Sequence, residues 1–199
     1  DIDFVCDYKD FKRLCQYLRA HPHPSYVLQD NSSDPGYYKE WAQLRDLHSR
    51  EVTHYPAGSG DWWAAKALKY DGLHIDIFPY EGYMMAAKLS VNISMRFAGR
   101  HPHLAQWSYN LLHYTLIPVF RFTGRCFGRR DNCMHSYGAW FYEQNPREAM
   151  VPHRPIVFEG HTFEGPADPD RLCRIAYGDY MKLPPKDKRD RHEMTVEFL

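Results

Sequence analysis

Two stretches of the chain carry hydrophobic patterns typical of β-strands. Residues 1–5, Asp-Ile-Asp-Phe-Val, alternate polar and apolar side chains, and a period of two indicates a strand with one face buried. Residues 73–79, Leu-His-Ile-Asp-Ile-Phe-Pro, are more continuously apolar and hold one carboxylate, Asp76, between two isoleucines. We therefore predict strands at 1–5 and 73–79.

Further strands are predicted from short runs of β-branched, aromatic and apolar residues bounded by Gly, Pro or Asp. These runs lie at 25–29, 41–47, 157–160 and 161–165. The last two flank a turn and therefore predict a β-hairpin.

Helices are predicted where apolar residues recur at helical spacing after a capping residue. Asp7 is a candidate N-cap for a helix whose apolar positions run from Phe11 to Leu18, and which ends near the prolines of residues 21–24. A short helix is predicted from Asp168 to about residue 177, with Gly178 in position to cap its C-terminus. Strands and helices mixed along 199 residues predict a single α/β domain.

The segment 84–130 is helical and aromatic in pattern. Its part from Leu104 to Phe122 is apolar enough to raise the question of a membrane span, but polar residues interrupt it and Pro118 would kink it. Because a span needs about 20 mainly apolar residues, we predict none. The arginines that flank this part indicate either a solvated basic face or contact with anionic lipid head groups; they are Arg96, Arg100, Arg121, Arg125, Arg129 and Arg130.

Composition narrows the class of protein. The chain holds 25 Lys and Arg and 25 Asp and Glu, so its net charge gives no reason to predict a nucleic-acid partner. Its five cysteines include no Cys-x-x-Cys pair, which favours a reducing, cytoplasmic compartment over a disulfide-stabilised secreted class.

The candidate chemistry lies on the two predicted strands. Residues i and i+2 of a strand share a face, so Asp1 and Asp3 project together, and paired carboxylates of this kind hold a hard cation such as Mg²⁺. A charge at Asp76, within an apolar strand, is costly unless it is paired or bound to a metal. We expect the strands at 1–5 and 73–79 to lie side by side and to bring all three carboxylates to one cleft. The alternative for each Asp is a solvent-exposed residue at the end of a strand, without a functional role.

Several stretches, taken together and in order, resemble the LicD family of phosphotransferases, which is related to the fukutin group. They are Asp1-Ile2-Asp3-Phe4, Arg45-Asp46-Leu47-His48-Ser49, Ile75-Asp76-Ile77-Phe78-Pro79, Phe158-Glu159-Gly160, Tyr177-Gly178-Asp179-Tyr180-Met181, Leu183-Pro184-Pro185 and His192.

The resemblance implies a nucleotidyltransferase-like α/β (α+β) fold: a mixed sheet with flanking helices and a helical C-terminal half. It also implies a segment with a Gly turn before the acidic strand, which we expect to be missing from this chain. In this fold class that turn helps to seat nucleotide phosphates, so we expect the fragment alone to bind metal weakly and to lack catalysis.

The activity implied is the transfer of a phospho-alcohol such as phosphocholine from a CDP-activated donor, for example CDP-choline, to a sugar hydroxyl of a cell-surface glycan such as lipopolysaccharide or teichoic acid. Asp1, Asp3 and Asp76 would bind Mg²⁺ or Mn²⁺ and act in catalysis. The expected substrate contacts are Arg45, Asp46, Lys188, Arg189 and His192. The enzyme would be cytoplasmic, at the inner face of the membrane if its acceptor is lipid-linked.

Three alternatives stay open on the sequence alone. A strict nucleotidyltransferase would use the same carboxylates and move the nucleotide instead. A glycosyltransferase also uses Asp-x-Asp for a metal-bound sugar nucleotide, but its fold would surround the pair on both sides. A non-catalytic binding protein on the same fold is the third.

Overall fold

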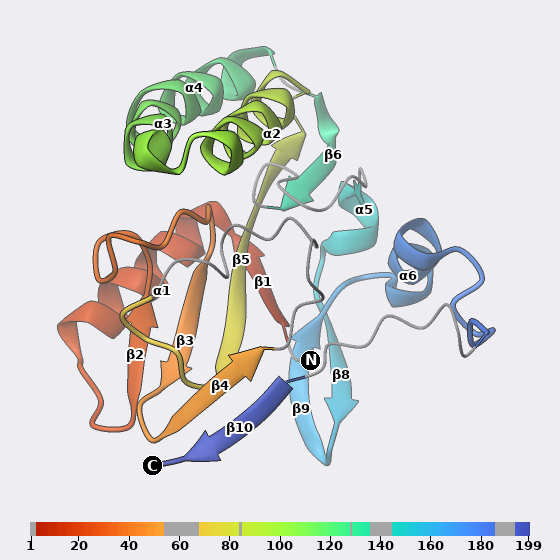
Figure 1. Ribbon diagram of the computed structural model, residues 1–199. Helices are drawn as coiled ribbons and strands as arrows, with labels where there is room; N and C mark the ends of the chain where they lie inside the picture. The colour runs from red at the N-terminus through yellow and green to blue at the C-terminus, as the bar shows by residue number, and fades with distance from the viewer. Residues whose placement is uncertain (1–2, 54–67, 84, 128, 136–144, 186–193) are drawn as a thin grey trace.

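The computed structural model describes residues 3–53, 68–83, 85–127, 129–135, 145–185 and 194–199. A mixed six-stranded sheet lies at the centre of the molecule, with a layer of helices beyond one end of the long strand β5 (Figure 1). The strands of this sheet are β1 (Asp3–Asp7), β2 (Tyr26–Gln29), β3 (Ala42–Asp46), β5 (His74–Tyr83), β6 (Arg129–His135) and β7 (Asn145–Pro146). The mixed α/β class that the sequence predicts is confirmed.

Strand β5 organises the sheet. It pairs in parallel with β1 and antiparallel with both β3 and β6, while β2 and β7 extend the sheet at the outside. The predicted strands at 1–5 and 73–79 therefore do lie side by side. A parallel pair needs a crossover, and the connection here includes helix α1 (Tyr8–Ala20).

Helix α1 begins and ends where its sequence indicates. The Asp7 side chain accepts a hydrogen bond from the Lys9 backbone N–H, as an N-cap does, and the helix ends at Ala20 before the prolines. Its inner face buries Cys15 against Leu28 and Ala42 of the sheet.

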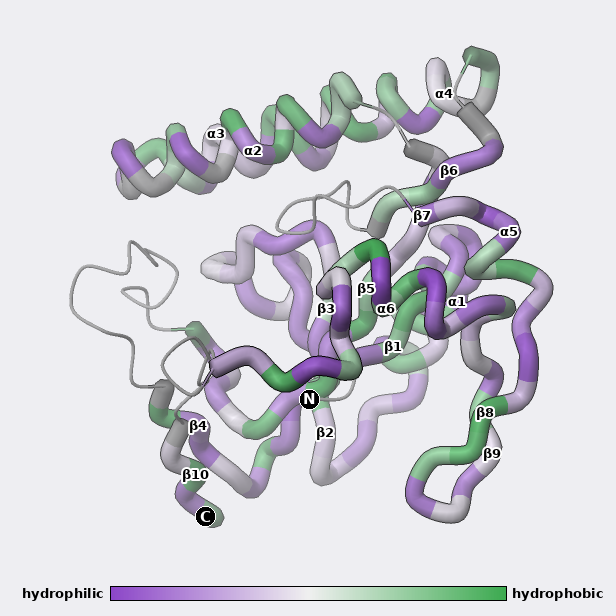
Figure 2. The backbone as a smooth tube through the Cα atoms, turned by 90° about the vertical axis from the view of Figure 1, so that its right-hand side faces the viewer, coloured by the Kyte–Doolittle hydropathy of each residue, from purple (hydrophilic) through white to green (hydrophobic). Residues whose placement is uncertain are grey.

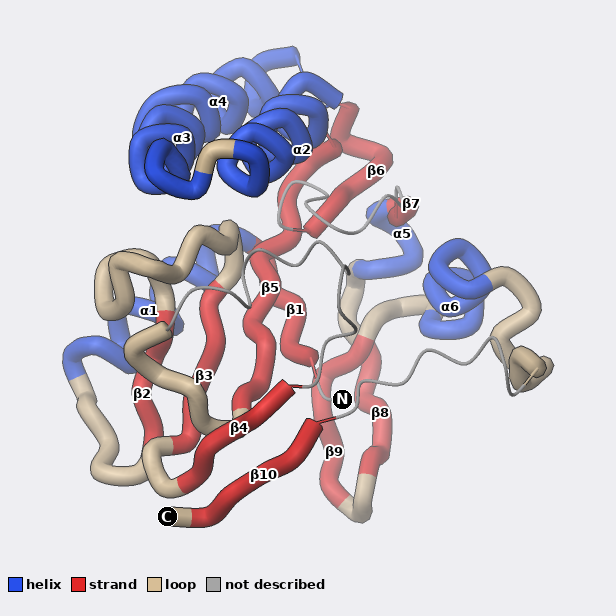
Figure 3. Tube along the Cα trace, in the orientation of Figure 1, coloured by secondary structure: helices blue, strands red, loops and turns tan. Residues whose placement is uncertain are grey.

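The helical layer is formed by α2 (Met85–Arg100), α3 (Ala105–Leu111) and α4 (Ile117–Phe127) (Figure 3). A 3₁₀ turn at Pro102–Leu104 separates α2 from α3, and a π-helical turn at Leu112–Leu116 joins α3 to α4. The π turn comes just before Pro118, whose missing N–H interrupts regular helical bonding. In the described part of the chain, no helix combines the length and the apolar character that crossing a membrane requires.

The main hydrophobic core lies between this layer and the sheet. Buried side chains of the helices pack there with buried side chains of the sheet and of the residue before β3, and two further helical side chains lie partly buried at the margin. The helices contribute Ala87, Val91, Leu112 and Ile117, the sheet side contributes Trp41, Phe78 and Met134, and the margin holds Leu116 and Phe120. A second cluster joins Tyr38 to Ala98, Ala105 and Tyr109.

The remaining elements form two small sheets and two short helices. Strand β4 (Ser49–Thr53) pairs with the final strand β10 (Met194–Phe198), and β8 (Arg154–Phe158) forms a hairpin with β9 (His161–Gly165). The helices are α5 (Arg147–Met150) and α6 (Pro169–Tyr177).

The expectation of a helical C-terminal half is met only in part. The long helices occupy 85–127, in the middle of the chain, and after residue 128 the described residues form short strands, loops and the two short helices. The physical reason is that the long apolar runs end at Phe127, whereas the later sequence is rich in Pro, Gly and β-branched residues, which favour turns and strands.

Candidate functional site

Two carboxylates meet where β1 lies beside β5. In the parallel register Asp3 is the partner of Asp76, and directly paired residues of neighbouring strands place their side chains on the same face of a sheet. The pairing that we predicted for Asp3 and Asp76 is thus present. Asp1 lies outside the described residues.

The two carboxylates influence each other. Asp3 is an exposed residue, but partial burial of its carboxyl group raises its pKa above the ordinary value, the negative charge of Asp76 raises it further, and His74 opposes the shift. The Asp3 carboxylate accepts no hydrogen bond from any residue that the structure describes. This pair of like charges would be stabilised by a cation held between the two groups.

Asp76 is fixed by two donors from the neighbouring strand and the residue before it. The Trp41 indole Nε1–H and the Gln43 amide Nε2 both donate to its Oδ1, at 2.9 and 2.6 Å. These hydrogen bonds offset the desolvation free energy of a carboxylate that lies between two isoleucines. Among the described residues nothing donates to Oδ2, so that oxygen is left available to a ligand.

Gln43 is in turn oriented by Arg45. The Arg45 Nη2 group donates to the Gln43 side-chain oxygen at 2.9 Å, which fixes the amide with its NH₂ group toward Asp76. The buried Arg45 side chain also donates to Gln29 at 2.8 Å, to the Gly72 carbonyl at 2.6 Å and to Glu51 at 3.2 Å. The structure therefore places Arg45 inside a buried network, as a support for the site, and a contact with donor phosphate stays a prediction.

Glu51 closes this network. Its Oε2 atom also lies 2.9 Å from His74 Nδ1, and the Glu51 side chain is only 8% exposed. His74 precedes Asp76 by two residues on β5, so the two side chains share a face. Strands β3, β4 and β5 thus contribute one continuous network of polar side chains around Asp76.

Sequence reasoning missed Gln43, Glu51 and His74. The signal for two of them was present as alternation: Trp41, Gln43 and Arg45 lie at every second position, as His74 and Asp76 do. Gln43 pairs with Asp76 in the antiparallel register and Arg45 with His74. No local signal pointed to Glu51, because β4 belongs to a different sheet.

Asp46 has a local role at the turn between β3 and β4. A hydrogen bond from the Ser49 side chain, aided by the turn's backbone N–H groups, lowers the pKa of Asp46. This carboxylate organises the turn, and a contact with substrate stays a prediction.

The other predicted substrate contacts, Lys188, Arg189 and His192, lie outside the described residues. The strand that follows them, β10, pairs with β4 and sets Val196 opposite Glu51. The end of the chain therefore returns to the strand that supplies Glu51.

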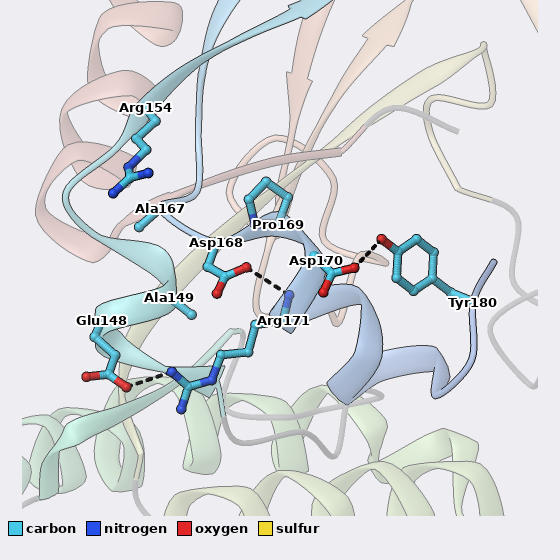
Figure 4. Close-up of a pocket in the computed structure, with 9 residues that line it drawn as sticks. All are labelled: Glu148, Ala149, Arg154, Ala167, Asp168, Pro169, Asp170, Arg171 and Tyr180. Carbon is cyan, nitrogen blue, oxygen red and sulfur yellow. Dashed lines mark hydrogen bonds and ion pairs between the residues drawn. The ribbon is translucent and has the colours of Figure 1, made fainter.

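A second Asp-x-Asp pair, Asp168 and Asp170, borders a cavity of about 690 Å³ at the start of α6 (Figure 4). Asp168 accepts a bond from the Arg171 backbone N–H as the N-cap, and Asp170 accepts bonds from Arg174 and Tyr180 at 2.7 Å each. The Arg171 side chain is paired with Glu148. These carboxylates stabilise the helix and its neighbours, so this pair is the weaker candidate.

Three thiols that are buried or partly buried, those of Cys6, Cys15 and Cys133, give no candidate nucleophile. Burial raises the pKa of Cys6 and of Cys133 to about 11, and that of Cys15 to about 12. A thiol with a raised pKa is a poor nucleophile at neutral pH.

Within the described residues, no group of three or more His, Cys, Asp or Glu side chains is arranged to hold a metal ion. Asp3 and Asp76 supply two carboxylates, and Mg²⁺ is commonly held by one or two carboxylates with water and substrate phosphates as its other ligands. The two side chains fit such a cation. Comparison with known family models, curated proteins and solved structures gave no match to this chain.

Proposed function

We propose that the protein transfers a phospho-alcohol group, of the phosphocholine type, from a CDP-activated donor to a sugar hydroxyl of a glycan, on a nucleotidyltransferase-like fold. The observation that carries this proposal is the in-register pairing of Asp3 with Asp76 on adjacent parallel strands. The ordered resemblance to the LicD family supports the substrate class, and the mixed sheet is compatible with the fold.

Asp3 and Asp76 would hold Mg²⁺ or Mn²⁺, with Asp1 as a third ligand. The cation would neutralise the phosphate oxygens of the donor, where charge builds up during phosphoryl transfer. A cation would also remove the repulsion that raises the pKa of Asp3.

Asp76 is positioned by the protein itself. Because Trp41 and Gln43 both bind Oδ1, the carboxylate plane is fixed and Oδ2 has a defined direction. That oxygen suits either a metal ligand or a general base for the sugar hydroxyl. Arg45 acts one step further out, as a positioning residue, through its bond to Gln43.

In the proposed reaction the acceptor oxygen forms a new bond to the phosphorus of the phosphocholine group. The bond from that phosphorus to the bridging oxygen breaks, and CMP leaves with that oxygen. The hydroxyl proton passes to the base. A strict nucleotidyltransferase would attack the other phosphorus and release phosphocholine, so the leaving group separates the two functions.

The test is to incubate the full-length protein with CDP-choline labelled in the choline or in the cytidine, together with Mg²⁺ and a panel of sugar acceptors. We expect the choline label on the acceptor and the cytidine label in CMP. Cytidine label on the acceptor would establish nucleotidyl transfer instead. If neither label is transferred and CDP-choline still binds, the protein is a binding protein and not a transferase.

Asp3→Asn and Asp76→Asn should each reduce Mg²⁺-dependent turnover by about a hundredfold or more, because each removes a charged ligand while its shape is kept. Both variants should stay folded, since the amide oxygen introduced by Asp76→Asn still accepts hydrogen bonds from Trp41 and Gln43. Asp170→Asn is the matched control, because it makes the same change in the other Asp-x-Asp pair and should leave turnover unchanged. Turnover retained in Asp3→Asn or Asp76→Asn would remove that residue from the site.

A further inference from the structure

The helical layer exposes large apolar side chains on the side of its helices that faces away from the core. On α2 the side chains of Met85, Leu89 and Ile93 are exposed, by 57%, 53% and 67%. They recur every four residues and so form one stripe along the helix. Buried Ala87 and Val91 of the same helix pack against the core instead.

The second long helical run repeats this arrangement. Trp107 and Leu111 of α3, Tyr114 of the π-helical turn and Phe122 of α4 are exposed, with Trp107 at 60% and Phe122 at 70%. The inner side of the same run is formed by buried residues, namely Ala105, Tyr109, Leu112 and Ile117. Both sets of side chains are therefore exposed to solvent on helices whose other residues pack in the core.

We refer to this surface as the apolar helical face. Its members are Met85, Leu89, Ile93, Trp107, Leu111, Tyr114 and Phe122. The helices that carry it lie remote from β4, β10 and the C-terminus, as two views at right angles show (Figures 1 and 2). Monomeric proteins rarely leave so many large apolar side chains together in water, and such a face usually marks an interaction surface.

The charge of the segment is the evidence for the kind of partner that the face fits. All 25 Asp and Glu residues of the chain lie outside residues 82–130, while that segment holds seven Lys and Arg, of which Arg121 is paired with Glu81. Arg96 and Arg100 continue the stripe of α2 at helical spacing and are exposed, and no ion pair joins them to a described residue. A surface that joins exposed aliphatic and aromatic side chains to unopposed positive charge is typical of interfacial membrane binding.

We propose that the apolar helical face docks on an anionic lipid surface. The apolar side chains of α2, α3 and α4 enter the boundary between head groups and acyl chains, and Arg96 and Arg100 contact the anionic head groups at its margin. Trp107 and Tyr114 suit this position because their amphipathic rings favour the membrane–water interface. The proposal does not depend on the proposed enzymatic activity.

The test is binding of the full-length protein to vesicles of phosphatidylcholine alone and of phosphatidylcholine mixed with phosphatidylserine, measured by flotation. We expect binding to the anionic vesicles that weakens as salt is raised, because the attraction is screened within about 10 Å at 0.1 M ionic strength. We expect much weaker binding to the neutral vesicles. Brominated lipid should quench part of the emission of the five tryptophans, and that part should be lost in Trp107→Phe.

Matched variants separate this face from general effects. Ile93→Glu and Phe122→Glu should each weaken binding about tenfold or more, because each removes an inserted side chain and adds repulsion. Val157→Glu is the control: Val157 is 75% exposed on β8, far from the helical layer, and the change in net charge is the same. Arg96→Gln combined with Arg100→Gln should weaken binding to anionic vesicles about tenfold and leave any neutral binding unchanged.

Several results would overturn the proposal. Equal binding to neutral and anionic vesicles would do so, as would binding that neither Ile93→Glu nor Phe122→Glu weakens. A third result is that the protein fails to bind vesicles and sediments as a dimer that Ile93→Glu dissociates. That result would assign the face to self-association instead.

Discussion

Asp3 and Asp170 belong to identical Asp-x-Asp pairs in different surroundings. Asp170 lies in the first turn of α6, is exposed, and is bonded to Arg174 and Tyr180, which together lower its pKa. Asp3 lies in a strand opposite Asp76, with no such donors among the described residues, and its pKa is raised. The same short motif therefore caps a helix in one place and leaves an unneutralised pair of charges in the other.

Arg45 shows how burial decides what a charged side chain does. Its side chain is 7% exposed, its partner Glu51 is 8% exposed, and four groups accept hydrogen bonds from it. Removing one member of a buried ion pair leaves the other charge without compensation, at a cost of about 3–5 kcal/mol.

We predict that Arg45→Met lowers the free energy of unfolding by about 3 kcal/mol or more, measured by urea denaturation. The control is Arg50→Met on β4, where the pair with Asp71 is more than half exposed on both sides. That exposed pair should contribute about 1 kcal/mol or less. Full stability in Arg45→Met, with a raised KM for the donor, would instead show that Arg45 binds phosphate directly.

At the scale of elements, the β8–β9 hairpin depends on two residues with positive φ. Glu159 has φ 49° and Gly160 has φ 77°, and together they form the two-residue turn. Turns of this kind match the twist of the strands and favour Asn-Gly or Asp-Gly. Glutamate lacks the local hydrogen bonding that lets Asn and Asp adopt this conformation, so Glu159 is the strained member.

We predict that Glu159→Asn stabilises the hairpin by roughly 0.5–1 kcal/mol, whereas Gly160→Ala destabilises it by about 1 kcal/mol. No atom lies within 4 Å of a Cβ built on Gly160, so this cost would come from the backbone alone. Because much of the hairpin is exposed, the change should be read from amide hydrogen exchange of β8 and β9. Faster exchange in Glu159→Asn would contradict the assignment of strain.

At the scale of the whole molecule, the first and last strands of the chain both pair with strands that carry residues of the candidate site. The first strand reaches Asp76 through the sheet. The last strand reaches Glu51 through β4, and the Leu199 backbone N–H donates to the His48 carbonyl at 2.8 Å. Strand β10 thereby covers one edge of the strand that supplies Glu51, which would otherwise leave its backbone groups unpaired.

We predict that the closing segment has two separable roles. Truncation after Glu193 removes β10 alone and should lower the melting temperature, because β4 loses its partner strand. The triple substitution Lys188→Ala, Arg189→Ala and His192→Ala keeps β10 and should leave the melting temperature unchanged while raising the KM for the donor, if these side chains contact its phosphates.

The measurements are thermal unfolding and donor kinetics on both variants and on a truncation after Met181. An unchanged KM in the triple variant would show that residues 186–192 do not bind the donor. An unchanged melting temperature after removal of 194–199 would show that β10 adds no stability to β4.

The sequence by itself determined the elements whose signals are local. Asp7 marked the start of α1, Gly178 marked the end of α6, where its φ is positive at 68°, and alternation marked β1. Runs of β-branched, aromatic and apolar residues marked β3 and the β8–β9 hairpin, although β8 begins at Arg154, three residues before the predicted strand at 157–160. Caps and periodicity act within one or two turns of chain, so they can be read without knowing the fold. The pairing of Asp3 with Asp76 was predicted in addition, from the cost of an uncompensated carboxylate.

Only the tertiary structure decided which partners these elements meet. It buried Arg45 against Gln29, Gln43 and Glu51, joined β10 to β4, and turned the aromatic side of α3 and α4 outward. Each of these depends on contacts between residues far apart in sequence, whose stability comes from burial and hydrogen bonding in the assembled fold. A periodic pattern fixes which residues share a face, whereas the surroundings of that face fix whether it is buried, bonded or exposed.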